Sequence, residues 1–222
     1  MARHPVYEPL LFRTTMLDSS VRRHKLILAS SSPYRRTLLE RLRVPFDVSV
    51  PALDETPRAG ETPDATALRL AEAKARAVAQ REAAAGAPLL VIGSDQVATF
   101  DGLQIGKPGT HEAALAQLRA MRNRIVEFHS ALCLYDSSRD VAQVEDVVTR
   151  VRFRDLPDAE LDAYLRAETP YDVAGSAKSE GLGIALLESI ESDDPTALVG
   201  LPLIALTRML CVAGYPLFAG AR

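Results

Sequence analysis

The sequence predicts an α/β fold built on one mixed sheet. Apolar runs typical of buried strands alternate with helix-like segments along the whole chain, which favours this class over an all-α or all-β fold. The chain has 222 residues, of which 47% are hydrophobic and 25% charged. That size and composition suit one soluble globular unit with a sizeable core.

The first predicted elements are a strand and a helix. Residues 25–29 (KLILA) form a short apolar run, which indicates a buried strand. A helix is expected over 33–43, because Ser32 suits the N-cap and Pro33 suits the first helical position. A second strand is expected at 46–50 (FDVSV).

An alanine-rich helix follows a polar loop. It starts at Thr62 or Asp64 and runs to about Ala84. Residues 89–93 (LLVIG) are apolar without alternation, which is typical of a strand buried on both faces. The next residues predict a hairpin around Asp101-Gly102, a favoured two-residue turn.

The alternation of helices and strands continues in the C-terminal half. A helix capped by Thr110 is expected to end near Arg122. Long strands are expected at 125–135 and 144–154, and a further helix at 158–168. A glycine-containing loop, another strand and a closing helix complete the chain.

The overall composition excludes several function classes. The net charge of −3 provides no global basic field, which argues against duplex DNA or RNA as a partner. No apolar run approaches the ~18 residues of a membrane span. Cys133 and Cys211 stand in apolar contexts and are interpreted as core thiols of a cytoplasmic protein. Residues 1–24 show no structural period and are expected to be a flexible extension of a single domain at 25–222.

A candidate anion site follows the first strand. Residues 30–36 read SSSPYRR, where a strand ends and a helix begins, so that free N–H groups and the helix dipole favour an anion. Ser30 and Ser32 add hydroxyl donors, and Arg35 and Arg36 add guanidinium donors that match phosphate oxygens. The alternative is that Ser32 is only a cap and both arginines are solvated.

Asp95 and Lys74 are candidate catalytic groups. Asp95 is expected just past the end of strand 89–93, where ligands bind in open α/β sheets, and it could hold a metal or accept a proton. The alternative is a turn aspartate. Lys74 shares one helix line with Leu70 and Val78, so it either snorkels or meets a buried partner such as a phosphate.

The remaining charged candidates lie in loops. Lys107 (IGKPG) does not belong to a P-loop, because the glycine spacing is short and Pro108 replaces the required Ser or Thr. Glu55 and Glu180 are loop acids, a class that is ordinarily solvated. Taken together with Asp95, Lys74 and the arginines, they suit a metal-assisted phosphoanhydride hydrolase. His129 is expected to serve packing.

The order and spacing of the motifs resemble the Maf family of nucleotide pyrophosphatases over nearly all of residues 25–212. The motifs are LILASSSPYRRTLLERL, DET, LAEAKA, IGSDQV, IGKP, AGSAKSEGLG and LVGLPL. The resemblance implies an elongated, twisted sheet flanked by helices, similar to inosine triphosphatases, with the site in a central cleft. It also implies hydrolysis of a nucleoside triphosphate to the monophosphate and pyrophosphate, a divalent cation (magnesium or manganese) and a homodimer.

Roles carry over from the family by position. Ser30, Ser32 and Arg35 match its phosphate-binding turn. Glu55, Lys74 and Lys107 match catalytic positions, and Asp95 matches the proton acceptor. Asp95 and Glu55 would hold the cation.

Tyr34, Gln96 and Glu180 make the chain similar to the branch that hydrolyses 7-methyl-GTP. That branch commonly has Trp where this chain has Tyr34, whereas members that cleave dTTP and UTP read SPRR and GADT. A 7-methylated guanine is cationic, and an aromatic face attracts a stacked cation by ~0.5–2 kcal/mol. Glu180 could accept from the guanine N1–H and amine, and Gln96 could donate or accept.

Other readings stay open on the sequence. Tyr34 could instead pack above Leu38 and Leu42. The protein could cleave dTTP, UTP or another non-standard nucleotide, or could be a nucleotide-binding regulator of cell division. Whether Arg36, Ser176 and Lys178 contact substrate is not decided by these patterns.

Overall fold

The structure is a computed structural model that describes residues 24–82 and 86–218. The extension expected at residues 1–24 lies, apart from His24, outside the described residues. The predicted α/β fold is confirmed: a seven-stranded sheet has the order β2-β1-β3-β5-β6-β7, with β4 paired to β3. The strands are β1 Lys25–Ala29, β2 Asp47–Val48, β3 Leu89–Phe100, β4 Leu103–Ile105, β5 Ile125–Asp136, β6 Val141–Phe153 and β7 Leu187–Glu191.

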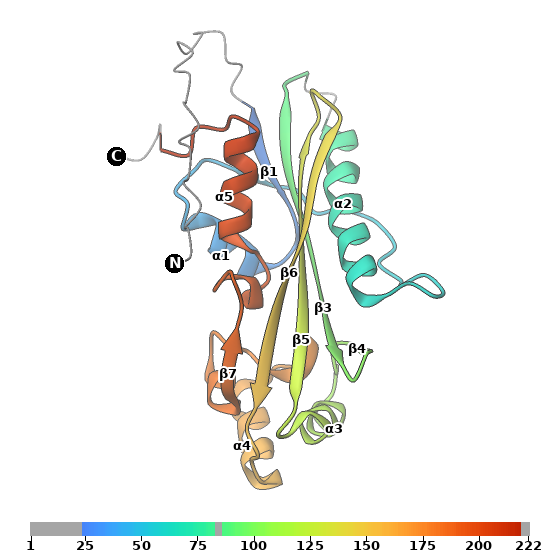
Figure 1. Cartoon of the computed structure of the whole chain (residues 1–222), viewed down its shortest axis with the longest axis vertical. Helices are drawn as coiled ribbons and strands as arrows, with labels where there is room; N and C mark the ends of the chain where they lie inside the picture. Colours follow the sequence, from blue (N-terminus) through green and yellow to red (C-terminus); the bar gives the residue numbers. More distant parts are fainter. Residues whose placement is uncertain (1–23, 83–85, 219–222) are drawn as a thin grey trace, which may run out of the picture.

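Helices cover both faces of this sheet. The α-helices are α1 Pro33–Glu40, α2 Pro63–Glu82, α3 His111–Met121, α4 Asp158–Glu168 and α5 Leu203–Val212. Short 3-10 helices are η2 Ala174–Ser176, η3 Leu182–Leu186 and η4 Ala197–Val199. Figure 1 shows an elongated molecule in which α1 and α5 lie on one side of the sheet and α2 on the other, while α3 and α4 lie at the opposite end.

The sheet combines parallel and antiparallel pairs, and its long strands give the molecule its elongated shape. Strand β1 is parallel to both β2 and β3, whereas β3, β5, β6 and β7 pair antiparallel in turn. The long β3, β5 and β6 run through both halves of the molecule (Figure 1). No helix within residues 24–82 and 86–218 is long and apolar enough to cross a membrane.

Alternating strand residues build separate cores on the two faces, because neighbouring side chains of a strand point to opposite sides. Leu28 and Ile92 pack with α1 and α5, whereas Ile27 and Val91 pack with α2. A third core joins α3 and α4 to the far parts of β5 and β6, around Phe128. The sheet is therefore buried on both faces in the half that carries β1, as its unbroken apolar runs predicted.

Glycine is required where α2 crosses β3. A Cβ built on Gly93 would lie 2.0 Å from the Ala71 carbonyl oxygen and 2.9 Å from the Ala75 nitrogen. Both atoms belong to helix backbone, which cannot rotate away. Gly93 therefore lets α2 pack closely against the sheet next to Asp95.

Several predicted boundaries were wrong. The strand expected at 89–93 continues to Phe100, because Ser94–Thr99 keep pairing with Leu132–Glu127 of β5. The strand expected at 46–50 is only Asp47–Val48, and the first helix ends at Glu40 rather than 43. Cys133 is buried as predicted, but Cys211 is exposed at the end of α5 and is no core thiol.

The sheet has a gap at the end of β1. On this edge β3 pairs with β1 through Leu89–Gly93 and with β4 through Ala98–Phe100. Among the described residues, Ser94–Val97 therefore have a strand partner only on the β5 side. Side chains from both faces of β3 can reach this gap.

Candidate active site

A cavity of about 520 Å³ lies at the gap between β1 and β4. Its lining comes from the turn after β1, from α2, β3 and β4, and from the segment between α4 and β7. Every site residue predicted from the sequence lines it: Ser30, Ser32, Tyr34, Arg35, Glu55, Lys74, Asp95, Gln96, Lys107 and Glu180. The fold thus brings into one cavity residues that are spread over most of the chain.

Lys74 joins the two predicted carboxylates. Its ammonium nitrogen lies 2.7 Å from Asp95 Oδ1 and 3.1 Å from Glu55 Oε1. Lys74 and Asp95 are buried, whereas the Glu55 side chain is 56% exposed. The lysine therefore has a buried partner, and the alternative of a snorkelling lysine was wrong.

Asp95 reaches this lysine from the middle of β3, not from beyond a strand end. The strand end that opens the site is that of the neighbouring β1, which ends at Ala29, opposite Gly93 of β3. Within the described residues, only Lys74 donates a hydrogen bond to the Asp95 carboxylate. The second carboxylate oxygen is thus available to a ligand or a water molecule.

The turn after β1 is held by its own side chains. Ser32 caps α1, its hydroxyl accepting from the Arg35 N–H at 3.4 Å, and the Ser30 hydroxyl accepts from the Ser32 N–H at 3.1 Å. The Arg35 guanidinium donates to the Gly200 carbonyl at 2.8 Å and to Ser30 Oγ at 3.4 Å. Burial lowers the pKa of Arg35, while the Asp95 and Glu55 charges oppose that shift. An arginine stays charged in proteins, so this turn presents a fixed cation beside the carboxylates.

Gln96 lies on the opposite face of β3 from Asp95 and contacts η4. Its amide nitrogen donates to Ser130 Oγ at 2.9 Å, to the Ala197 carbonyl at 3.2 Å and to the Leu198 carbonyl at 2.9 Å. These contacts occupy the donor atoms of the amide. Gln96 can therefore offer a ligand only its carbonyl oxygen, an acceptor, although its residue type allowed both roles.

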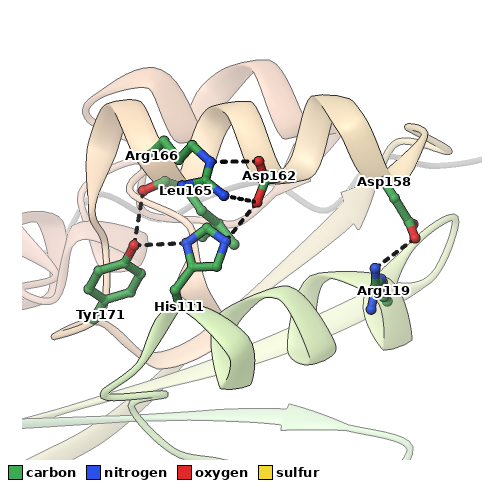
Figure 2. Close-up of polar contacts among 7 residues, drawn as sticks. All are labelled: His111, Arg119, Asp158, Asp162, Leu165, Arg166 and Tyr171. Carbon is green, nitrogen blue, oxygen red and sulfur yellow. Dashed lines mark hydrogen bonds and ion pairs between the residues drawn. The ribbon is translucent and has the colours of Figure 1, made fainter.

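A polar network next to the cavity connects two of the segments that line it. Figure 2 shows His111, at the start of α3, in contact with the Tyr171 hydroxyl at 3.1 Å and with Asp162 of α4 at 2.8 Å. The Gly109 N–H donates to the Tyr171 carbonyl at 3.0 Å. The loop that carries Lys107 and the segment that leads to Glu180 are thereby tied together.

The structure also places the residues that sequence reasoning left open. Arg36 is exposed and pairs with Glu40, so it does not line the cavity. Ser176 is buried and donates to Gln117 Oε1 at 2.6 Å, so it shapes the loop. Lys178 does line the cavity. Sequence reasoning missed Ser94 and Gly200: the Ser94 hydroxyl donates to the same Gly200 carbonyl as Arg35, at 3.0 Å, and only the motif LVGLPL hinted at this contact.

The carboxylates of the cavity are possible ligands of a metal ion. Residues 24–82 and 86–218 hold no group of three or more His, Cys, Asp or Glu side chains that could bind an ion by themselves. Asp95 and Glu55 nevertheless converge on one ammonium group. Magnesium commonly takes one or two carboxylates and completes its shell with phosphate oxygens and water. The site fits that mode of binding.

A cavity that combines a buried acid–lysine pair with a serine–arginine turn defines a phosphate-processing α/β protein. The chain belongs to the Maf family: the family model described as "Maf-like protein" matches residues 25–213.

Relatives with a stated activity are similar over most of the chain. A "7-methyl-GTP pyrophosphatase" of Paraburkholderia xenovorans is 77% identical over 202 residues, covering 91% of this chain and 98% of the relative. A protein of the same name from Burkholderia thailandensis is 80% identical over 195 residues, covering 87% and 90%. Among solved structures, a nucleoside-triphosphatase (dITP/XTP pyrophosphatase) from Mycobacterium abscessus matches 86% of this chain and 93% of its own, with a TM-score of 0.37 and 17% identity.

Proposed function

We propose that this protein hydrolyses 7-methyl-GTP to 7-methyl-GMP and pyrophosphate, removing a modified nucleotide. One observation carries the proposal: the pair Lys74–Asp95 shares one cavity with Tyr34, Gln96 and Glu180. The first group suits phosphoanhydride hydrolysis and the second suits a methylated guanine. Membership in the Maf family and the names of the similar proteins support both parts.

The chemistry is assigned to the buried pair. Asp95 accepts a proton from the water that attacks the triphosphate, and the bond between the α- and β-phosphates breaks. Lys74, 2.7 Å away, holds the carboxylate in place by a hydrogen bond to Oδ1. Ser30, Ser32, Arg35 and Lys107 bind phosphate oxygens and stabilise the charge that develops on them.

A divalent cation, magnesium or manganese, would be held by Asp95 and Glu55 together with phosphate oxygens. When bound, such an ion neutralises phosphate charge and polarises the phosphorus centre. Glu55 suits this use because it is largely exposed and free to move. Its contact with Lys74 would then be exchanged for one with the ion.

The base selection is assigned to groups that only accept hydrogen bonds, apart from the stacking aromatic. Glu180 is a carboxylate, and Gln96 has only its carbonyl oxygen to offer. Guanine presents adjacent N1–H and amine donors, whereas uracil and thymine present one N–H between two carbonyls. Acceptors therefore favour guanine over UTP and dTTP. The Tyr34 ring would stack on the cationic purine.

The test compares pyrophosphate release from 7-methyl-GTP by the wild type and by Asp95→Asn, with magnesium or manganese. Asparagine keeps the size of the side chain but cannot accept the proton. We expect the variant to lose turnover while remaining folded, with a lowered thermal unfolding midpoint, because Lys74 then keeps only its contact with the exposed Glu55 carboxylate. Retained turnover in a folded Asp95→Asn protein would remove Asp95 from its assigned role.

A further inference from the structure

Lys178 has a charged group at the cavity with no strong partner. Its side chain is only 17% exposed. Among the described residues its ammonium is close to the Tyr34 hydroxyl, and the Asp172 carboxylate lies 3.8 Å away, itself 68% exposed. An ammonium carries three donors, so these two neighbours leave at least one donor without a partner, which is costly in a partly buried site. Such a group is suited to an acceptor on a ligand.

The backbone of Lys178 is fixed in position. Its N–H donates to the Tyr164 hydroxyl at 3.1 Å, and its carbonyl accepts from the Gly181 N–H at 3.1 Å. Gly183 packs directly on it, because a Cβ there would lie 2.4 Å from the Lys178 oxygen and 2.5 Å from its nitrogen. Burial raises the pKa of Tyr164 to about 12, so this phenol stays neutral. The side chain thus starts from a rigid point two residues before Glu180.

Lys178 lines the cavity two residues before Glu180 and close to Tyr34, the two groups assigned to the base. Burial lowers its pKa, but Tyr34, Asp172 and Glu168 more than reverse that shift. The groups that act on Arg35 are different: burial, Asp95 and Glu55. Lys178 is therefore a neighbour of Tyr34, whereas Arg35 is a neighbour of the Asp95 and Glu55 carboxylates.

The charge balance at this end disfavours a phosphate ligand. Glu180 and Asp172 line the cavity with Lys178, and the charge of Glu168 also raises the pKa of Lys178. Carboxylates therefore outnumber the lysine around this loop, so the local field is negative. A negative field attracts a cationic base and repels a triphosphate. The donor of Lys178 therefore has to meet an acceptor on the base.

We propose that Lys178 donates a hydrogen bond to O6 of 7-methylguanine while Glu180 accepts from N1–H and the amine. This inference rests on the proposed function and adds a specificity residue to it. Guanine presents O6 next to N1–H, so an adjacent donor and acceptor on one loop match its edge. The positive charge of the methylated ring strengthens N1–H as a donor to Glu180.

The experiment pairs a substrate lacking O6 with a variant lacking the ammonium. The substrates are 7-methyl-GTP and the triphosphate of 7-methyl-2-aminopurine riboside, which carries hydrogen at C6 and therefore lacks both O6 and the N1–H. The variants are Lys178→Met, Lys178→Arg and, as a matched cavity lysine, Lys107→Met. Pyrophosphate release gives kcat/KM, and calorimetry on the Asp95→Asn background gives Kd without turnover.

We expect the wild type to prefer 7-methyl-GTP strongly over the analogue, which loses its contacts with both Lys178 and Glu180. The hydrogen bond to Lys178 should account for roughly ten- to a hundredfold of this preference, the effect of a hydrogen bond to a charged group. Lys178→Met should lose that factor on 7-methyl-GTP and change little on the analogue, and Lys178→Arg should keep part of it. Lys107→Met should lower kcat/KM equally for both substrates, because the assigned partner of Lys107 is phosphate.

Equal losses on both substrates in Lys178→Met would overturn the inference, since they would mean a phosphate contact or a disturbed loop. No loss on either would overturn it as well. If Asp95→Asn shows the Lys178-dependent difference in Kd but the wild type releases no pyrophosphate, the inference stands and the proposed function fails.

Discussion

Replacing Lys74 by Met should destabilise the fold, because it leaves the Asp95 carboxylate without its only hydrogen-bond donor among the described residues. Asp95 is 8% exposed and Lys74 5% exposed, so neither group is well solvated. Methionine preserves most of the apolar stem, and the loss therefore reports on the charge.

The size of the effect follows from burial. Removing one partner of a buried ion pair typically costs about 3–5 kcal/mol. Asp95 borders a cavity that water can enter, which favours the lower end, about 3 kcal/mol. For a chain of this length, each kcal/mol lowers the unfolding midpoint by about 2–4 °C, giving roughly 6–12 °C. The contact with Glu55 adds little, because that side chain is mostly exposed.

The assay is thermal unfolding followed by circular dichroism, with a matched control. Lys25 and Asp47 form an ion pair with the same 2.7 Å separation, but their side chains are 45% and 62% exposed. Lys25→Met should leave the midpoint nearly unchanged. The double variant Lys74→Met/Asp95→Asn should be more stable than Lys74→Met alone, since it removes the unpaired charge. Equal midpoints for Lys74→Met and Lys25→Met would refute the reasoning.

The remaining predictions use the same structure. Gly93→Ala should lower the free energy of unfolding, measured in urea, by about 3 kcal/mol or more, because the Ala71 carbonyl leaves no room for a methyl group. Gly106→Ala, with open space around it, should leave that free energy nearly unchanged. Similar losses of stability in the two variants would contradict this account. The pKa of Glu61 is lowered from 4.5 to about 2, chiefly by its hydrogen bonds to Arg69, so the stability that Glu61 contributes is complete above pH 4.5 and is lost as the pH falls toward 2. Unfolding midpoints of Glu61→Gln should therefore show less acid sensitivity in that window; an unchanged slope would exclude Glu61 as a source. Tyr34→Ala should lower the preference for 7-methyl-GTP over GTP by roughly 2- to 30-fold, and Tyr34→Phe should not; an equal loss in both variants would point to the hydroxyl rather than the ring.

The parts of the fold with local signals could be predicted from the sequence. The Ser32 cap and Pro33 define the start of α1, and the structure has this cap. The Asp101-Gly102 turn joins β3 to β4, with positive φ at both residues as a two-residue hairpin requires. In such places the residues that determine the structure are neighbours in the chain.

The parts that depend on distant partners could not be predicted in the same way. Asp95 was expected beyond a strand because the unbroken apolar run ends at Gly93, yet pairing with β5 keeps β3 extended. Arg35 donates to Gly200, 165 positions away, and no local pattern marks that contact. The motif order identified the site residues through the family resemblance, but their geometry, including the engaged amide of Gln96, required the fold.

The measurement that tests the central claim most directly is kcat/KM for pyrophosphate release across 7-methyl-GTP, GTP, UTP, dTTP, CTP and ITP, with Asp95→Asn as the blank. The account predicts that kcat/KM is far higher for 7-methyl-GTP than for UTP and dTTP. It also predicts that kcat/KM for GTP is lower than for 7-methyl-GTP by the factor assigned above to stacking of the cationic base on Tyr34. Faster turnover of UTP or dTTP would contradict the base selection by Tyr34, Gln96 and Glu180. Turnover no greater than the blank for every nucleotide would contradict the enzymatic function itself.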